Sequence, residues 1–176
     1  MIRQAELLRD FVNTYDVESD ADEITSPAEL AVWLRERDLV GEADRALDDD
    51  LHVATMLRSG LRAAMSRDGG PHTTLEQALA ALPLRVAFDG EIPSLTPVAA
   101  GVRGGLARLA AAMAATQADG TWRRLKVCAE PTCRWAFLDL SKNRSRSWCS
   151  MSICGNRMKT RAYRMRRRAA TGSRRP

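Results

Sequence analysis

Four cysteines, arranged in two pairs, constrain the C-terminal third of this 176-residue chain. The first pair is Cys128 and Cys133, the second is Cys149 and Cys154, and the sequence contains no other cysteine. Four residues lie inside each pair, and fifteen residues separate the two pairs. Four thiolates can complete a closed tetrahedral Zn²⁺ site, and a tight turn can bend two neighbouring cysteines toward one ion. The spacing therefore predicts that all four cysteines bind one zinc ion.

Two disulfide bonds, or four unrelated buried thiols, are the alternatives to a zinc site. The chain begins with the polar run Met1-Ile-Arg-Gln-Ala-Glu, which is not followed by the apolar segment of a secretory signal, so we expect a cytoplasmic location. Disulfide bonds are rare in that compartment. Unrelated cysteines seldom fall into two equally spaced pairs, although this spacing is looser than the C-x-x-C of many zinc sites. We therefore favour the zinc site.

Charge divides the chain at about residue 120. Residues 121–176 contain 16 basic and 2 acidic residues, a net charge of +14, whereas residues 1–120 have a net charge of −9. We expect an acidic N-terminal domain over 1–120 and a basic module over 121–176, with Asp119-Gly120 at the boundary. A module this basic is typical of proteins that bind a polyanion. The alternatives are that the basic side chains are only solvated, or that they rest on the acidic domain.

A basic helix is predicted over residues 155–168. Four arginines recur at helical spacing and form one stripe, while Met158, Ala162 and Met165 form a second stripe that could dock on the rest of the protein. A basic segment over 141–147 precedes this helix. Arginine, lysine, serine and asparagine side chains are common phosphate contacts. The candidate nucleic-acid contacts are Lys142, Arg144, Arg146, Asn156, Arg157, Lys159, Arg161, Arg164 and Arg168.

Asn156 has two interpretations, because it stands at the predicted start of this helix. Its side chain can cap the helix, or it can pair with adenine in a nucleic-acid groove.

The N-terminal part reads as a set of amphipathic helices with one β-hairpin. We expect helices over residues 3–15, from Ser26-Pro27 to about Gly41, over about 42–67, from a capping box at 73–76 to Pro83, and from Thr96-Pro97 to about 118. Gly69-Gly70-Pro71 is expected to stop the third helix. Leu84, Val86 and Phe88 alternate with other residues before an Asp89-Gly90 turn, which predicts a hairpin. The expected fold class is α+β, predominantly α-helical, and no apolar run is long enough to span a membrane.

The basic module is expected to form a knuckle, a hairpin and then a helix, which resembles a treble clef. Trp122, Leu125 and Val127 indicate a strand before the first cysteine pair. Trp135, Phe137 and Trp148 are expected to form a small core of their own, although an exposed tryptophan could instead stack on a base. Such a module is too small to fold without its metal, so loss of zinc should unfold it and spare the N-terminal helices.

Two motifs carry a family resemblance. The run 137–151, followed by Cys154-Gly155-Asn156-Arg157, resembles the CGNR zinc finger, which is named for that tetrapeptide. Asn13-Thr14 resembles part of the ABATE domain that commonly precedes this finger. From the residues alone, we favour a pair that ends the helix over one that lines a polar pocket. The resemblance implies a bacterial-type, stress-linked transcriptional regulator with zinc bound by Cys128, Cys133, Cys149 and Cys154.

The leading hypothesis is a zinc-dependent DNA-binding regulator whose N-terminal domain senses a small molecule or mediates assembly, for example as a homodimer. The alternatives are an RNA-binding protein, or an interaction module in which the basic helix grips an acidic protein. We do not expect an enzyme. A closed four-cysteine site leaves zinc no open position, and the sequence has no Ser-His-Asp, Cys-His or HExxH set.

Overall fold

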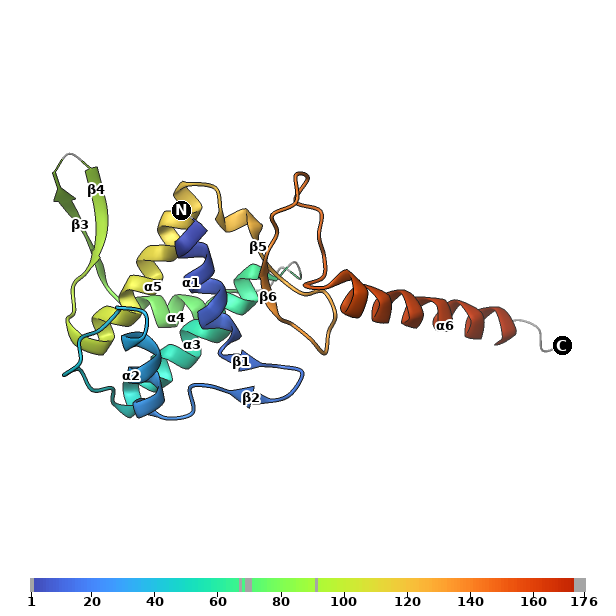
Figure 1. Cartoon of the computed structure of the whole chain (residues 1–176), viewed down its shortest axis with the longest axis horizontal. Helices are drawn as coiled ribbons and strands as arrows, with labels where there is room; N and C mark the ends of the chain where they lie inside the picture. The colour runs from blue at the N-terminus through green and yellow to red at the C-terminus, as the bar shows by residue number, and fades with distance from the viewer. Residues whose placement is uncertain (1, 67, 69–70, 91, 173–176) are drawn as a thin grey trace.

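Helices dominate the architecture of this protein. The computed structural model describes residues 2–66, 68, 71–90 and 92–172 (Figure 1). Its α-helices are α1 (Ile2–Asn13), α2 (Pro27–Arg35), α3 (Asp48–Met65), α4 (Thr73–Ala80), α5 (Gly101–Ala118) and α6 (Asn156–Gly172). Its antiparallel strand pairs are β1 (Tyr15–Asp16) with β2 (Ala21–Asp22), β3 (Leu84–Asp89) with β4 (Ile92–Pro97), and β5 (Leu125–Val127) with β6 (Ala136–Leu138). The prediction of a mostly helical α+β fold is confirmed.

One hydrophobic core joins the helices to the β5–β6 hairpin. Leu8 of α1, Leu57 of α3 and Leu106 of α5 are completely buried in it. The apolar side chains of the hairpin belong to the same core: Leu125, Val127, Ala136 and Leu138. The hairpin of the basic module therefore packs directly against the N-terminal helices.

The expected separate core of Trp135, Phe137 and Trp148 does not form. Trp135 is 38% exposed. The Arg146 guanidinium lies over Phe137, with its carbon atom 5.2 Å from the centre of the Phe137 ring. Of the three, Trp148 packs against the cysteines. The strand alternation explains this, because Phe137 points to the face of β6 opposite Ala136 and Leu138.

The start of α2 confirms a prediction. Ser26 caps it, accepting a hydrogen bond from the Glu29 N–H, and the Glu29 carboxylate accepts hydrogen bonds from the N–H and hydroxyl of Thr25.

Three other helix starts differ from the prediction. The third helix begins at Asp48, not near Glu42, because Asp44 accepts a hydrogen bond from the Gly41 N–H and closes a turn. The last helix of this part begins at Gly101, since Thr96 and Pro97 pair with β3 and continue β4. The short helix α4 has no side-chain cap. The predicted stop at Gly69-Gly70 lies outside the described residues.

Two glycines of α5 permit close packing. A Cβ on Gly104 would lie 2.5 Å from the Ala99 carbonyl oxygen, and one on Gly105 would lie 2.6 Å from a methyl group of Val40. These approaches bring α5 against the loops that precede α3 and α5.

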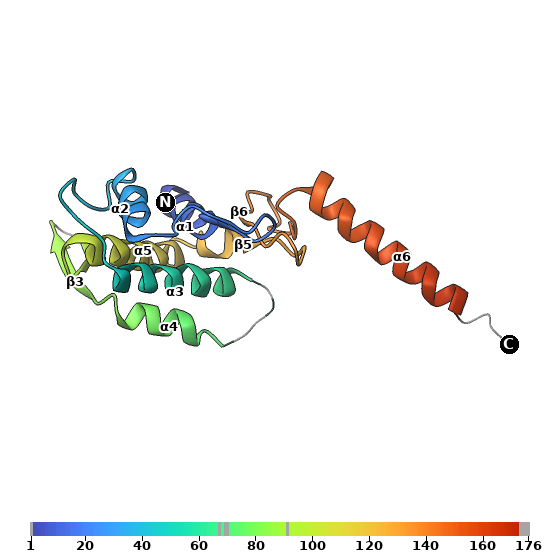
Figure 2. The ribbon, with the colours of Figure 1, turned by 90° about the horizontal axis from the view of Figure 1, so that it is seen from below.

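The hairpin β3–β4 and helix α6 lie at opposite ends of the molecule (Figure 1; Figure 2). Helix α6 starts at the cysteine-containing segment and extends away from the other helices. Residues 157–168 are exposed, apart from the half-buried Met158. The expected docking of the Met158, Ala162 and Met165 stripe is therefore wrong beyond the first turn, and both faces of the helix are accessible.

Candidate metal centre and basic helix

The four cysteines converge on one point. Their Sγ atoms all lie within 4.8 Å of one another, and the Sγ of Cys149 lies 3.7 Å from those of both Cys133 and Cys154. In a tetrahedron with Zn–S bonds of about 2.3 Å, neighbouring sulfurs are about 3.8 Å apart. Cys128, Cys133 and Cys154 are buried, and Cys149 is partly buried. The donor type, number and spacing fit a closed zinc site.

Local backbone turns produce this convergence. The first pair sits on a turn in which the N–H groups of Cys133 and Arg134 both donate to the Glu130 carbonyl, and Arg134 adopts a left-handed conformation with a φ of 51°. The second pair leads into a helical turn, where Ser150 accepts a hydrogen bond from the Ile153 N–H. Cys154 is thus in the first turn of the helical segment that continues as α6, where the helix dipole favours a thiolate.

Without a metal, the cysteines of the second pair hold their protons. Burial raises the pKa of the Cys149 thiol far above its usual range, and burial raises the pKa of the Cys154 thiol to about 12. A metal that binds four thiolates must displace these protons. Metal binding at this site should therefore release protons and weaken as the pH falls.

A buried ion pair fixes the basic segment between the two cysteine pairs. Lys126 Nζ donates to the Asp139 carboxylate at 2.6 Å and to the backbone carbonyls of Arg144 and Arg146. Asp139 also accepts from the N–H and hydroxyl of Ser141 and from the Arg146 N–H. Burial acts to raise the pKa of Asp139, but these donors hold it well below its usual range. Lys126 is therefore a structural residue, which its charge alone does not reveal.

Asn13 links the N-terminal helices to the cysteine-containing segment. Its side-chain amide donates to the Ala136 carbonyl at 2.9 Å, and its side-chain oxygen accepts from the Ala136 N–H at 2.8 Å. Thr14 accepts from Arg58, whose guanidinium also forms two hydrogen bonds to Asp22. The side chains of Asn13 and Thr14 are both buried. Asn13 and Thr14 thus have structural contacts, and Asn13 extends the ladder of β6.

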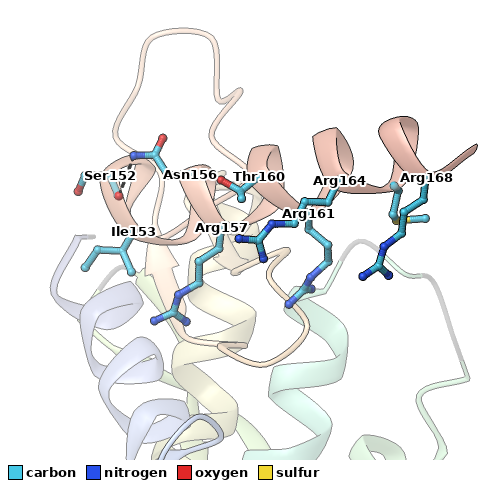
Figure 3. Close-up of a pocket in the computed structure, with 9 residues that line it drawn as sticks. Ser152, Ile153, Asn156, Arg157, Thr160, Arg161, Arg164 and Arg168 are labelled. Carbon is cyan, nitrogen blue, oxygen red and sulfur yellow. Dashed lines mark hydrogen bonds between the residues drawn. The ribbon is translucent and has the colours of Figure 1, made fainter. Parts of the chain in front are cut away.

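Four arginines of α6, at positions 157, 161, 164 and 168, line an open concavity of about 730 Å³. Figure 3 shows the side chains of Arg157, Arg161 and Arg168 pointing toward the N-terminal helices, whereas that of Asn156, which also lines the concavity, points away from them. The remaining lining includes two hydroxyls, from Ser152 and Thr160, and the apolar side chains of Ile153 and Met165. Guanidinium groups and hydroxyls in a row can bind a string of phosphates.

Two carboxylates contact this arginine row. Arg157 forms an ion pair of 2.6 Å with Glu18 in the turn between β1 and β2. Arg161 lies 3.2 Å from a carboxylate oxygen of Glu130, a completely buried side chain in the first cysteine turn. These contacts orient the first two turns of α6 relative to the cysteine cluster and the N-terminal part. Spacing along the sequence gave no signal for either pair.

The other predicted contacts are exposed but differ in their surroundings. Asn156 does not cap the helix: Ser150 does, and the Asn156 amide donates to the Ser152 carbonyl. The Arg146 guanidinium is held over Phe137 and donates to the Cys149 carbonyl. The remaining three predicted contacts are exposed and lie outside the arginine row: Lys142, Arg144 and Lys159.

These features define a mostly helical protein with a C-terminal four-cysteine metal centre from which a basic helix projects. Comparison with family models gives two matches: the CGNR zinc finger over residues 124–167, and ABATE, described as "Putative stress-induced transcription regulator", over residues 5–126. The chain belongs to the ABATE family, with a CGNR zinc finger at its C-terminal end. No curated protein matches it. Within the described residues, no helix has both the length and the apolar character needed to cross a bilayer.

Proposed function

We propose that this protein is a DNA-binding transcriptional regulator whose zinc finger presents α6 to the phosphate backbone. Zn²⁺ is held by Cys128, Cys133, Cys149 and Cys154 and supplies the structural link that fixes the start of the helix. The single observation that carries the proposal is the row of Arg157, Arg161, Arg164 and Arg168 on one side of an exposed helix.

The charge distribution supports phosphate as the binding partner. Helix α6 contains seven basic residues and no acidic residue. The planar guanidinium of arginine matches two phosphate oxygens with two parallel N–H groups, whereas the ammonium of lysine acts as a point charge without that fixed geometry. Phosphate contacts position a protein without reading the sequence, so base reading requires other groups. Asn156, which is exposed in the first turn and lines the same concavity, is a candidate for this role.

RNA is the second candidate, because a phosphate row serves either nucleic acid. An α-helix fits the major groove of B-form DNA, whereas the major groove of A-form RNA is too narrow for side chains to read. A helix whose residues 157–168 are exposed, apart from Met158, therefore favours duplex DNA. Competition between duplex DNA and structured RNA for the zinc-loaded protein distinguishes the two.

The direct test measures duplex DNA affinity against salt concentration. We expect the logarithm of the affinity to fall linearly with the logarithm of salt, because bound arginines release counterions. Replacing both Arg161 and Arg164 with alanine should weaken binding by roughly 10- to 100-fold and lower the salt slope by about 2.

A matched control removes the same charge from elsewhere on the helix. Lys159 and Arg166 are exposed and lie at least about 140° around the helix from every arginine of the row. The double alanine variant at these positions should lose less affinity than the Arg161/Arg164 variant. Equal losses would mean that net charge, and not the arginine row, carries the binding, and affinity that does not change with salt would contradict the proposal.

A further inference from the structure

The β3–β4 hairpin exposes large apolar side chains at the end of the molecule opposite α6 (Figure 1). Val86 is 67% exposed, Phe88 72%, Ile92 73% and Leu95 40%. Monomeric proteins rarely expose a contiguous apolar patch of this kind without a binding role. An isolated two-stranded hairpin is also marginally stable in water. Both arguments indicate that another surface covers the hairpin.

The register places Val86, Phe88 and Leu95 on one face, whereas Ile92 pairs with Asp89 on the other face. The cross-strand pairs Val86–Leu95, Phe88–Pro93 and Leu84–Pro97 are all apolar, and alternate with the pairs Arg85–Thr96 and Ala87–Ser94. Directly paired residues of an antiparallel sheet share a face. The hairpin thus has one apolar face and one mostly polar face, on which Ile92 is the exception; this is the pattern of a sheet that packs against a core. Only its base does so, where Leu84 contacts the main core.

An apolar groove lies beside this face. It has a volume of about 870 Å³ and separates β4 from α5, with Pro93 and Leu95 on one side. The opposite side is formed mainly by small side chains: Ala111, Ala112, Ala114, Ala115 and Ala118. The same surface of this chain therefore carries bulky apolar side chains that project from the hairpin and a hollow lined by alanines.

We propose that a second copy of this chain covers the hairpin. The two hairpins pack with their apolar faces together around a twofold axis, and each directs Val86 and Phe88 toward the partner's hairpin and alanine-lined groove. A twofold interface requires one patch that is complementary to itself, and projection and hollow lie side by side here. Pro93 and Pro97 cannot donate hydrogen bonds to an added strand, so side-chain packing, and not extension of the sheet at β4, covers this surface.

The surface is large enough for a small dimer interface. The apolar face of the hairpin and the groove lining together provide about fifteen residues on each partner. A standard interface uses about 20–30 residues on each partner, so we expect an interface smaller than the standard size. The arginine row lies at the other end of the molecule, so this dimer leaves both copies of α6 accessible.

The test is the mass of the full-length, zinc-loaded, nuclease-treated protein in solution, by sedimentation or light scattering. At about 0.5 M NaCl, where charge-mediated association is screened, we expect a dimer of two 19.4 kDa chains. Replacing both Val86 and Phe88 with lysine should give the monomer and raise the dissociation constant by roughly 100-fold or more. Because both side chains are exposed, circular dichroism should stay unchanged.

Two further variants sharpen the test. Ala115→Trp fills the groove from the other side of the interface and should also weaken the dimer. Val32 and Leu140 lie outside the hairpin and the groove, and their side chains are 47% and 67% exposed. A control variant with both residues changed to lysine should remain dimeric. A wild-type mass of 19.4 kDa up to about 100 µM, a mass that grows beyond the dimer, or a dimer that survives both interface changes would overturn the proposal. The Arg161/Arg164 variant should stay dimeric, which separates this result from DNA binding.

Discussion

At the scale of single residues, Asn13 is the most informative side chain of the N-terminal part. Its amide satisfies both backbone groups of Ala136, which are 123 residues away in the sequence and buried. No other type of side chain both donates and accepts in this geometry at the same length, because aspartate lacks the donor. These two hydrogen bonds between Asn13 and Ala136 therefore connect α1 to β6 inside the shared core.

Asn13→Ala should lower the free energy of unfolding by about 2–3 kcal/mol, because it leaves a buried N–H and C=O of Ala136 without partners. Urea denaturation of the zinc-loaded protein measures this. Asn13→Asp should also destabilise, since its carboxylate faces the Ala136 carbonyl. The exposed Asn143→Ala is the control. If Asn13→Ala lowers the free energy of unfolding by no more than about 0.5 kcal/mol, the contact between Asn13 and Ala136 does not stabilise the fold.

Asp139 predicts a dependence on pH. Its folded pKa lies below its usual value, mainly through hydrogen bonds from Lys126 and Ser141 that overcome burial. The unfolded chain therefore binds more protons just below pH ~4, so this group stabilises the fold fully above that pH and the stabilisation is lost as pH falls toward the folded pKa. Asp139→Asn should flatten the fall of unfolding free energy over that range. An identical pH profile for both proteins would contradict the assignment.

At the scale of elements, α6 combines exposure with dense like charge. Four arginine pairs at helical neighbour spacing lie along it: Arg157–Arg161, Arg161–Arg164, Arg164–Arg167 and Arg164–Arg168. Each like-charge pair costs about 0.2–0.5 kcal/mol of helix stability. Beyond its first turns the helix packs against little, so bound anions should decide how stably it forms.

Adding duplex DNA at low salt should therefore increase the helical circular dichroism signal of the protein, because phosphates remove the repulsion between arginines. Arg164→Gln removes three of the four pairs, so it should have a higher signal without DNA and a smaller gain with it. The gain should also shrink as salt screens the charges. An equal signal with and without DNA, in both proteins, would mean that α6 is fully helical on its own.

The sequence predicted elements better than the contacts between them. Helical periodicity identified the buried stripes of α1 and α5, and cysteine spacing identified the convergent cluster, because both are local patterns. The helix that was predicted from Glu42 begins instead at Asp48, because a side-chain turn at Asp44 competes with helix. The Asn13–Ala136 and Glu130–Arg161 contacts join distant segments, and no periodicity encodes them.

At the scale of the whole molecule, zinc and the N-terminal helices are coupled through one core. The sequence alone suggested a finger that unfolds by itself when zinc is lost. In the structure, however, Leu125, Val127, Ala136 and Leu138 pack among the side chains of the N-terminal helices, and Asn13 of α1 pairs with β6. A finger that loses its metal should therefore loosen α1 as well.

Hydrogen exchange of the zinc-loaded and chelated proteins tests this coupling. Removal of zinc, or Cys154→Ser, should speed exchange across α1, because the β5–β6 hairpin no longer holds its C-terminal end. Exchange in α4, which packs on α3 and away from the hairpin (Figure 2), should change less and serves as the internal control. Asn13→Ala should reproduce part of the effect on α1 while zinc stays bound. Unchanged α1 exchange in a chelated protein whose finger is unfolded would mean that the two parts fold separately, despite their common core.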